Sequence, residues 1–298
     1  MQHSPITLEA LLVLDAIDNR GSFAAAAEQL NKVPSAVSYI VQKLEEQLSV
    51  TLFVRQGRRS ILTPAGRYLL DEGRKVLGVV GNIAQQTQTI SHGWEPKIRV
   101  TFDTIFDVTL LLPVLAEFLI HHPNIEIDLT EEVMNGGWEA LIEDRIDLLI
   151  GAPAPVPSQQ GIRATPVYQI LQKLIVAHSH PLAHQNQPIT KADIAQYRTV
   201  VVHDSAKKGV PWSTNVIEQS QRFYVDSVDH KIAAITAGIG VGFLPVGRVQ
   251  HQLARGELVA IEVTDAHNQT DDIYMAWKMV NKGKGLQHLR TLIDQLVF

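Results

Sequence analysis

The sequence contains no cysteine among its 298 residues. This absence excludes disulfide bonds, catalysis by a thiolate and zinc sites built on cysteine. Long hydrophobic runs are also missing, and the longest apolar stretches fall well short of the roughly 20 residues that span a bilayer. The first residues lack a basic segment followed by an apolar one, which argues against a signal peptide. We therefore expect a cytoplasmic protein with no membrane partner.

Motifs of common enzyme and cofactor sites are absent as well, including G-x-S-x-G, H-E-x-x-H and the phosphate-binding P-loop. Residues 238–243 read Gly-Ile-Gly-Val-Gly-Phe. The third glycine of a dinucleotide-binding motif would fall at Phe243, and the segment follows a predicted helix rather than a strand. Three histidines, His178, His180 and His184, surround a proline, where either a metal site or a simple turn is conceivable. We expect no enzymatic activity, no cofactor and no metal.

The chain also has no excess of positive charge, since its net charge is −5. Within residues 1–63, cations and anions balance. Three arginines are nevertheless concentrated in residues 55–59. Fields act over a Debye length of about 10 Å, so this local cluster can attract phosphates although the whole chain is acidic.

Residues 22–48 predict two helices separated by a short break at residues 31–34. Ser22 is a suitable N-cap for the first helix, which is rich in alanine. The second has apolar residues at positions 37, 40, 41, 44 and 48, the spacing of a half-buried helix. Its opposite face carries side chains that can form hydrogen bonds with base edges in a major groove. These are Ser35, Ser38, Tyr39, Gln42 and Lys43.

Residues 52–62 predict two short strands around a basic tip. Guanidinium groups of Arg55, Arg58 and Arg59 would contact phosphate oxygens there. Two helices, a tight turn and a basic wing together predict a winged helix-turn-helix that binds double-stranded DNA. A three-helix subdomain with a solvated basic loop is the alternative.

Thr63 and Pro64 predict the start of a long helix, with Thr63 as N-cap and Pro64 in the first turn. A helix that continues to about Ser91 would be on the order of 40 Å long. Four apolar residues recur at every seventh position, as in a coiled-coil seam. They are Leu69, Val76, Ile83 and Ile90. The seam predicts pairing of two chains, and packing of the helix on its own domain is the alternative.

From residue 93 the pattern changes to strands that alternate with helices, which indicates an α/β domain with a parallel sheet. Strands are predicted at 98–102, 125–129, 147–151, 172–178, 199–203, 222–225, 241–244 and 273–278. Helices are predicted at 110–122, 138–144, 192–196, 228–237, 247–254 and 286–297.

Several segments match a known family in order and spacing. They are Gly21-Ser22-Phe23, Ser35-Ala36-Val37-Ser38, Leu44-Glu45-Glu46-Gln47-Leu48, Leu52-Phe53 and Leu62-Thr63-Pro64-Ala65-Gly66. Residues 7–66 thereby resemble the DNA-binding domain of LysR-type transcriptional regulators. Pro34 and Ser35 stand where the family usually has Gln and Pro, and Tyr39 where it often has Arg. The preferred DNA sequence therefore cannot be carried over.

The resemblance extends over nearly the whole chain. It implies a winged-helix domain at 1–63, a linker and dimerisation helix at 64–92, and an effector domain at 93–298. The effector domain would look like a two-lobed periplasmic binding protein, with lobe one at 93–165 and 271–298 and lobe two at 166–270. A homodimer or homotetramer is implied, and RNA polymerase is a further candidate partner.

The resemblance also implies a small-molecule effector between the lobes, at strand ends and helix N-termini. Backbone N–H groups at such places can bind carboxylates. The expected effector-binding residues are Asp103, Thr104, Gly136, Gly137, Trp138, His203, Asp204 and Ser227. For each, an ordinary capping or loop role is the alternative. Asp103 would repel an anion, so it suits a hydroxyl, an amine or a helix cap.

Two segments, Gly136-Gly137-Trp138-Glu139 and Met275-Ala276-Trp277-Lys278, are similar to a subgroup linked to aromatic-compound sensing. The turn His180-Pro181-Leu182-Ala183 is common in the family, which favours a structural role for its histidine. The competing function is a solute-binding protein or an enzyme on the same periplasmic-binding-protein-like fold. It would need export or a catalytic constellation, and the sequence shows neither.

Overall fold

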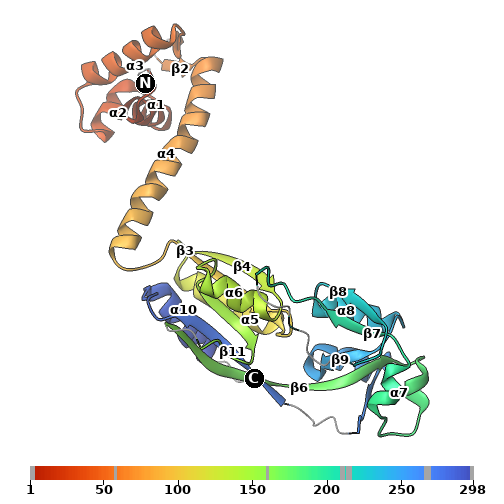
Figure 1. The fold of residues 1–298 in the computed structure, drawn as a ribbon. Coiled ribbons are helices and arrows are strands. Elements are labelled where there is room, and N and C mark those ends of the chain that lie inside the picture. Colours follow the sequence, from red (N-terminus) through yellow and green to blue (C-terminus); the bar gives the residue numbers. More distant parts are fainter. Residues whose placement is uncertain are drawn as a thin grey trace. The chain divides into compact units, whose positions relative to one another are not determined.

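The computed structural model describes residues 4–56, 59–158, 161–208, 212, 217–264 and 270–295, without the side chain of Arg59. The chain divides into two compact units, Met1–Ser91 and His92–Phe298 (Figure 1). The long helix is grouped with the helices that precede it. The predicted fold class, a winged helix-turn-helix followed by a long helix and an α/β domain, is confirmed.

The first unit consists of helices and one hairpin. Its elements are α1 (Leu8–Arg20), α2 (Phe23–Gln29), α3 (Pro34–Leu48), β1 (Phe53–Gln56), β2 (Arg59–Leu62) and α4 (Pro64–Ser91). Hydroxyl groups cap three of the helices, two of them, at Ser22 and Thr63, as predicted. Thr7 and Ser22 accept the N–H groups of Ala10 and Ala25, and Thr63 accepts that of Gly66. These short-range bonds fix where the helices begin.

Close contacts hold α3, the hairpin and the start of α4 together. The Glu45 carboxylate of α3 accepts the N–H groups of Leu52 at 2.6 Å and Phe53 at 3.1 Å, which anchors the hairpin. A Cβ at Gly66 would lie 2.2 Å from the carbonyl oxygen of Leu52. Glycine is therefore required where α4 passes the hairpin, because a side chain has no room there.

The first half of α4 also packs against α1. A Cβ at Gly73 would lie 2.6 Å from a methyl carbon of Leu11, which explains a glycine inside this helix. The next residue, Arg74, pairs with Asp15 at 2.7 Å and with Asp18 at 2.9 Å. The helix is thus fixed to its own unit up to about this residue.

Seven strands form the main sheet of the second unit, in the order β10-β6-β11-β5-β3-β4, with β9 also paired to β6. Of these, β9 comprises Gly242–Pro245 and β10 comprises Leu258–Ile261. Three of them, β3 (Lys97–Asp103), β4 (Glu126–Glu132) and β5 (Leu148–Pro153), are parallel. The long strands β6 (Ile162–Ala177) and β11 (Thr270–Lys278) are antiparallel to each other, and β11 is antiparallel to β5. The sheet is therefore mixed and not, as we had predicted, parallel, because it includes β6 and β11. We call these two the crossing strands, since the chain passes between the lobes at them.

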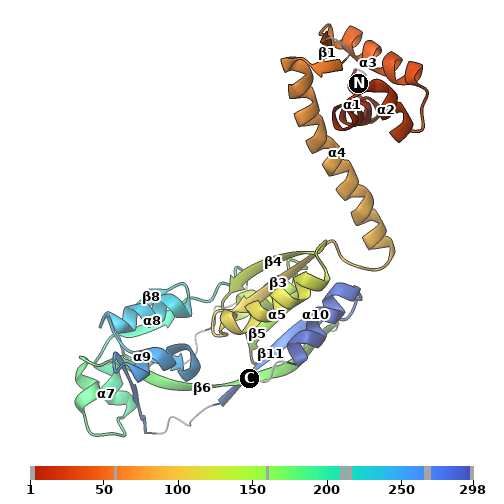
Figure 2. The same ribbon diagram turned by 180° about the vertical axis from the view of Figure 1, so that it is seen from behind.

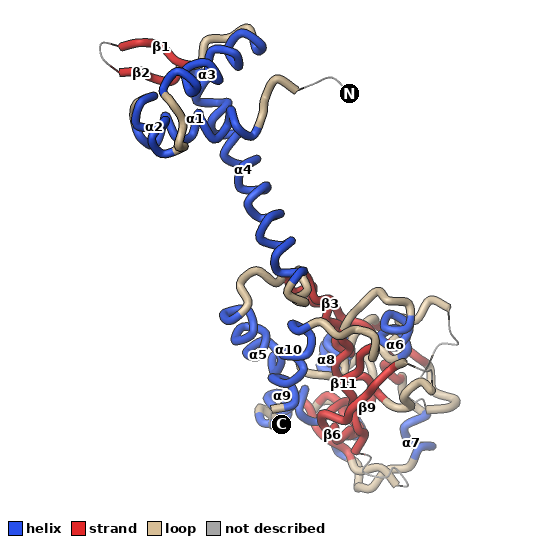
Figure 3. The backbone as a smooth tube through the Cα atoms, turned by 90° about the vertical axis from the view of Figure 1, so that its left-hand side faces the viewer, coloured by secondary structure: helices blue, strands red, loops and turns tan. Residues whose placement is uncertain are grey.

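Helices cover both faces of the sheet in lobe one. Helices α5 (Val108–His121) and α10 (Lys284–Asp294) lie side by side on one face, and α6 (Asn135–Ile142) lies on the other (Figures 2 and 3). Leu111, Phe118 and Leu289 are fully buried between the first two helices and the sheet. This core fixes the strand ends that border the space between the lobes.

Lobe two is built on the far end of β6, which extends into it from lobe one (Figure 1). Its strands are β7 (Thr199–Val202), β8 (Arg222–Val225), β9 (Gly242–Pro245) and β10 (Leu258–Ile261). Its helices are η1 (Pro181–His184), α7 (Lys191–Ala195), α8 (Val228–Thr236), η2 (Val246–Val249) and α9 (Gln250–Ala254). The sequence pattern missed β10 and began β6 ten residues late, and it predicted a single helix at 247–254 where the structure has η2 followed by α9.

Candidate DNA-binding face and effector pocket

The five polar residues predicted for the second helix lie together on the exposed side of α3. Ser35, Ser38, Tyr39, Gln42 and Lys43 are all exposed, and Tyr39 is 63% exposed. The opposite stripe, which holds the helix in the core, is buried. One side-chain bond constrains the face, from the Gln42 amide to Glu46 at 2.9 Å. Donors and acceptors thus project into solvent from a rigid helix.

The hairpin beside α3 carries the predicted basic residues. Arg55 is exposed on β1. Arg58 lies outside the described residues, and only the backbone of Arg59 is described, in β2. The ring of Phe53, at the base of the hairpin, packs edge-to-face on Phe23 of α2 with centroids 5.3 Å apart. The hairpin is therefore supported by the helical core.

The predicted seam of α4 is mostly bare within one chain. Leu69 is half-buried against its own unit. Val76, Ile83 and Ile90 are 47%, 57% and 55% exposed, and none of them belongs to a hydrophobic cluster of the described residues. Val79 and Val80 beside them are exposed as well, and an exposed apolar surface of this length is typical of a contact surface.

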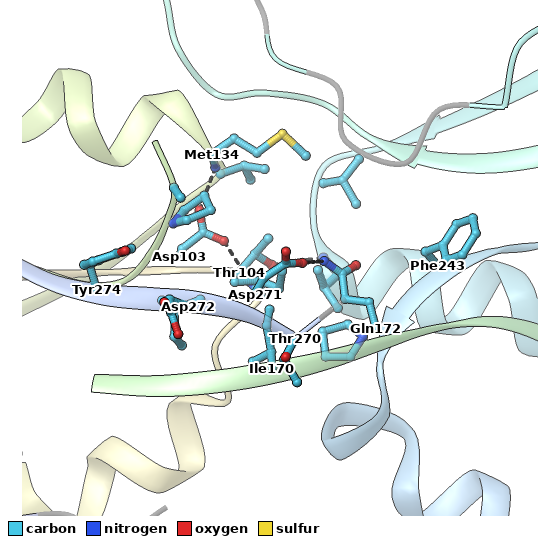
Figure 4. A pocket seen from close by; sticks show the side chains of 18 of the residues that line it. Asp103, Thr104, Met134, Ile170, Gln172, Phe243, Thr270, Asp271, Asp272 and Tyr274 are labelled. Carbon is cyan, nitrogen blue, oxygen red and sulfur yellow. Dashed lines mark hydrogen bonds between the residues drawn. The ribbon is translucent and has the colours of Figure 1, made fainter. Parts of the chain in front are cut away.

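A pocket of about 430 Å³ lies between the two lobes of the second unit (Figure 4). Lobe one contributes strand ends and the turn before α6, lobe two contributes α8 and β9, and both crossing strands form the floor. The lining residues are Asp103, Thr104, Ile105, Val133, Met134, Pro153, Ala154, Ile170, Gln172, Val202, Val228, Lys231, Phe243, Pro245, Thr270, Asp271, Asp272, Ile273 and Tyr274. The walls are largely apolar with a few convergent polar groups, as is usual for small-molecule sites.

Asp103 braces the lobe-one wall of the pocket. Its carboxylate is 2% exposed and accepts the N–H groups of Ile105 at 2.9 Å and Met134 at 2.6 Å. The second bond holds Met134 at φ 51°, a left-handed conformation that is unfavourable for a residue with a side chain. Burial raises the pKa of Asp103 to about 7, against the opposing effect of the two N–H donors.

This pKa predicts a pH-dependent stability. The unfolded carboxyl ionises near pH 3.9. The stabilising contribution of protonated Asp103 is therefore fully present below that value and is lost as pH rises through about 7. We expect the free energy of unfolding of wild type to fall more steeply between pH 4.5 and 7 than that of Asp103→Asn, by at most about 1.4 kcal/mol per pH unit. Chemical denaturation at several pH values measures both slopes, and equal slopes would contradict the assignment.

Thr104 joins the lobes directly. Its buried hydroxyl accepts the N–H of Val228, at the start of α8, at 2.9 Å. Arg248 of η2 donates to the carbonyl oxygens of Thr104 at 2.8 Å and Phe106 at 2.6 Å. The hydroxyl thus accepts a bond from the protein and keeps its own proton as a donor, and its role in effector binding stays a prediction.

A second contact between the lobes forms near α6. Asp204 accepts the N–H of Gly136 at 3.2 Å, and the Ser205 hydroxyl accepts that of Val133 at 2.8 Å. A Cβ at Gly136 would lie 1.9 Å from the Ser205 oxygen, so this glycine lets the lobes approach. The N–H of Gly136, which we expected to bind a ligand, therefore donates to Asp204 of the other lobe.

Four other expected effector-binding residues lie away from the pocket lining. Trp138 is 2% exposed in the core behind α6, and its ring nitrogen donates to the carbonyl of Pro153 at 3.1 Å. Gly137 packs against Leu149 in the same core. His203 is exposed and stacks on Tyr224, and Ser227 caps α8. A helix N-terminus in the sequence does not reveal which side of that helix faces the core, and this ambiguity produced the misplacement.

The expectation had also missed several polar residues of the pocket. Lys231 comes from the fourth position of α8, and Gln172 from the middle of β6. Asp271 of β11 accepts the Gln172 amide at 2.8 Å (Figure 4). The aromatic rings at the pocket are those of Phe243 and Tyr274. The tryptophans that carry the aromatic-sensing resemblance are buried in the core, and that resemblance remains a prediction.

The loop with three histidines is held together by its own contacts. The Nδ1 of His180 accepts the N–H of Leu182 at 3.2 Å, and its ring packs on Tyr197. Across the described ranges, no group of three or more histidine or acidic side chains could hold a metal ion. No helix within those ranges has both the length and the apolar character needed to cross a membrane.

Comparison with known proteins gives matches over both units. Residues 8–67 match the bacterial regulatory helix-turn-helix protein family, lysR family, and residues 91–296 match the LysR substrate binding domain. The probable HTH-type transcriptional regulator YhaJ of Escherichia coli K12 is 33% identical over 279 residues, which cover 94% of this chain and 93% of that protein. The regulator PunR of the same strain is 33% identical over 257 residues, covering 85% and 82%.

Solved structures agree with this assignment. An OxyR cysteine mutant of Corynebacterium glutamicum aligns over 99% of this chain and 93% of its own, with a TM-score of 0.62 and 17% identity, and so shows the fold alone. A full-length BenM mutant aligns over 97% and 95%, with a TM-score of 0.52 and 25% identity. The alternative of a solute-binding protein or enzyme is not favoured, because full-length relatives are transcriptional regulators. The chain belongs to the LysR family of DNA-binding transcriptional regulators, in which a helix-turn-helix domain is joined to a domain that binds a small-molecule effector.

Proposed function

We propose that this regulator reads a two-fold symmetric DNA site with the exposed face of α3, while the β1–β2 hairpin contacts phosphates. The observation that carries the proposal is the exposed polar face of α3, directly opposite its buried stripe. Side chains on such a face can reach base edges when the helix lies in a major groove. The arginines of the hairpin would add affinity that is independent of base sequence.

Pairing through α4 supports the two-fold symmetry. The exposed seam of Val76, Ile83 and Ile90 would be buried against the same seam of a second copy. A homodimer or homotetramer follows from this proposal, since each DNA half-site needs one reading helix. RNA polymerase is the further partner through which a promoter-bound regulator would act.

The pocket between the lobes is the proposed effector site. An effector that contacts both walls would bind one arrangement of the lobes better than another, and only that difference can shift the equilibrium between them. The bonds from Thr104 to Val228 and from Asp204 to Gly136 cross the same gap. They are therefore the contacts that a change in lobe arrangement would remake.

Tyr39→Ala tests the DNA-reading face. Tyr39 is 63% exposed on α3, and its loss leaves the buried stripe intact. We expect selection from a randomised DNA library to return a changed base preference at one or two positions of each half-site. Gln47→Ala, at an exposed position nearer the end of α3, is the control and should keep the wild-type preference. Identical consensus sequences for Tyr39→Ala and wild type would remove Tyr39 from the residues that read DNA.

A further inference from the structure

Lys231 enters the pocket along a path that the fold keeps open. It lies on α8 and its side chain is half-buried. A Cβ at Gly242 of β9 would lie 2.6 Å from Lys231 Cε. Glycine at position 242 therefore leaves room for the aliphatic stem of the lysine. The stem is confined between helix and strand, and Lys231 is one of the residues that line the pocket.

The ammonium group of Lys231 has no counterion among the described residues. The side chain of Lys231 forms no hydrogen bond or ion pair with them, although three aspartates line the same pocket. Asp103 is engaged by two backbone N–H groups, Asp271 by the amide of Gln172, and Asp272 by that of Gln169. Asp229, the nearest acid on α8, pairs with Arg248.

Burial is the sole cause that lowers the pKa of Lys231, to about 8. A nearby carboxylate would raise the pKa instead, so the pocket acids exert no resolved attraction on the ammonium. A buried charge without a partner is unfavourable for folding. Proteins keep such groups where a ligand supplies the missing charge, and the surrounding pocket is the place from which it would come.

We propose that Lys231 is the anion-binding residue of this pocket and that the effector is a small carboxylic acid with an apolar body. This inference rests on the proposed function, because it places the effector between the lobes. The carboxylate would lie against lobe two at Lys231. Val202, Val228 and Phe243 would surround the apolar body. Asp103 tolerates an anion nearby because its own carboxyl is largely protonated below neutral pH.

The probes are benzoate, phenylacetate and hexanoate, each beside its primary amide, which has a similar shape and no charge. The experiment uses the full-length chain with its lysines labelled at ¹³Cε and observed by NMR spectroscopy. The resonance of Lys231 is identified as the one that is lost in Lys231→Met. We expect at least one carboxylate to shift that resonance and to raise the pKa of Lys231, and its amide to do neither. Lys231→Met should bind the same carboxylate about tenfold or more weakly, as expected for loss of a charged hydrogen bond.

Lys191→Met is the matched control, because Lys191 is an exposed lysine of lobe two on α7. It should bind the carboxylate like wild type. Lys231→Met without ligand should be at least as stable as wild type, since a charge without a partner has been removed. An amide that binds as well as its acid, or no response of Lys231 to any of the acids, would overturn the inference. These measurements use no DNA and are independent of the Tyr39→Ala test. If Tyr39→Ala changes the base preference as expected while the Lys231 resonance responds to none of the acids, only the anion site is rejected.

Discussion

Ile83→Asp in α4 is expected to convert the assembled protein into monomers and to weaken its binding to a symmetric DNA site by at least about a hundredfold. Ile83 is 57% exposed in the single chain and lies in the middle of the exposed seam. In a paired seam, the two introduced carboxylates would be buried and would face each other. Moving one charge from water into a buried site costs several kcal/mol. A hundredfold loss of DNA affinity corresponds to only about 2.7 kcal/mol.

The matched control for this change is Gln85→Asp. Gln85 is exposed on α4 two positions from Ile83, which places it on the other side of the helix. The Gln85→Asp substitution adds the same charge to the same helix, but outside the seam. Sedimentation velocity measures assembly, and fluorescence anisotropy with a full and a half DNA site measures binding. Unchanged assembly of Ile83→Asp would reject the seam, and equal losses in both variants would point to charge alone.

Thr104→Val is expected to lower the free energy of unfolding by about 1–3 kcal/mol and to weaken the effector response. Valine keeps the shape of threonine but cannot accept the N–H of Val228, which then remains buried without a partner. The effector-free protein should keep its affinity for DNA, because the DNA-reading residues belong to a separate compact unit. Thr104→Ser retains a hydroxyl and should restore most of the lost stability.

Amide hydrogen exchange distinguishes this explanation from simple loss of packing. The Val228 amide should exchange faster in Thr104→Val than in wild type, and at nearly the wild-type rate in Thr104→Ser. Chemical denaturation of the full-length variants gives the change in stability. If Val228 exchanged equally slowly in all three proteins, the bond between Thr104 and Val228 would not be what holds the lobes at this point.

The parts of the fold that the sequence predicted depend on neighbouring residues in the chain. Ser22 and Thr63 were recognised as caps because a cap contacts backbone groups only three residues away. The stripe of α3 was recognised for the same reason, since helix periodicity is local. By contrast, β6 was cut short because Pro166 interrupts its pattern. The structure accommodates this proline beside a register shift, where a regular ladder is interrupted.

The pocket was predicted less well, because its residues come together only in the folded protein. Asp103 and Thr104 were found since they follow a predicted strand, and both line the pocket. Lys231 was missed because its proposed role depends on Gly242 and on the lack of a carboxylate paired with it among the described residues, neither of which a helix pattern shows. Trp138 was misplaced because the aromatic residue after two glycines faces the core rather than the cleft.

The continuous strand β6 also limits how this protein can change in length. It runs without interruption from Ile162 in lobe one to Ala177 in lobe two. Side chains alternate between the faces of a strand, so an inserted residue reverses every side chain that follows it. One insertion after Tyr168 would turn Ile170 and Gln172 away from the pocket and would also exchange the two buried faces of lobe two. Insertions and deletions within β6 are therefore unfavourable, and the part of the effector specificity that β6 determines changes by substitution.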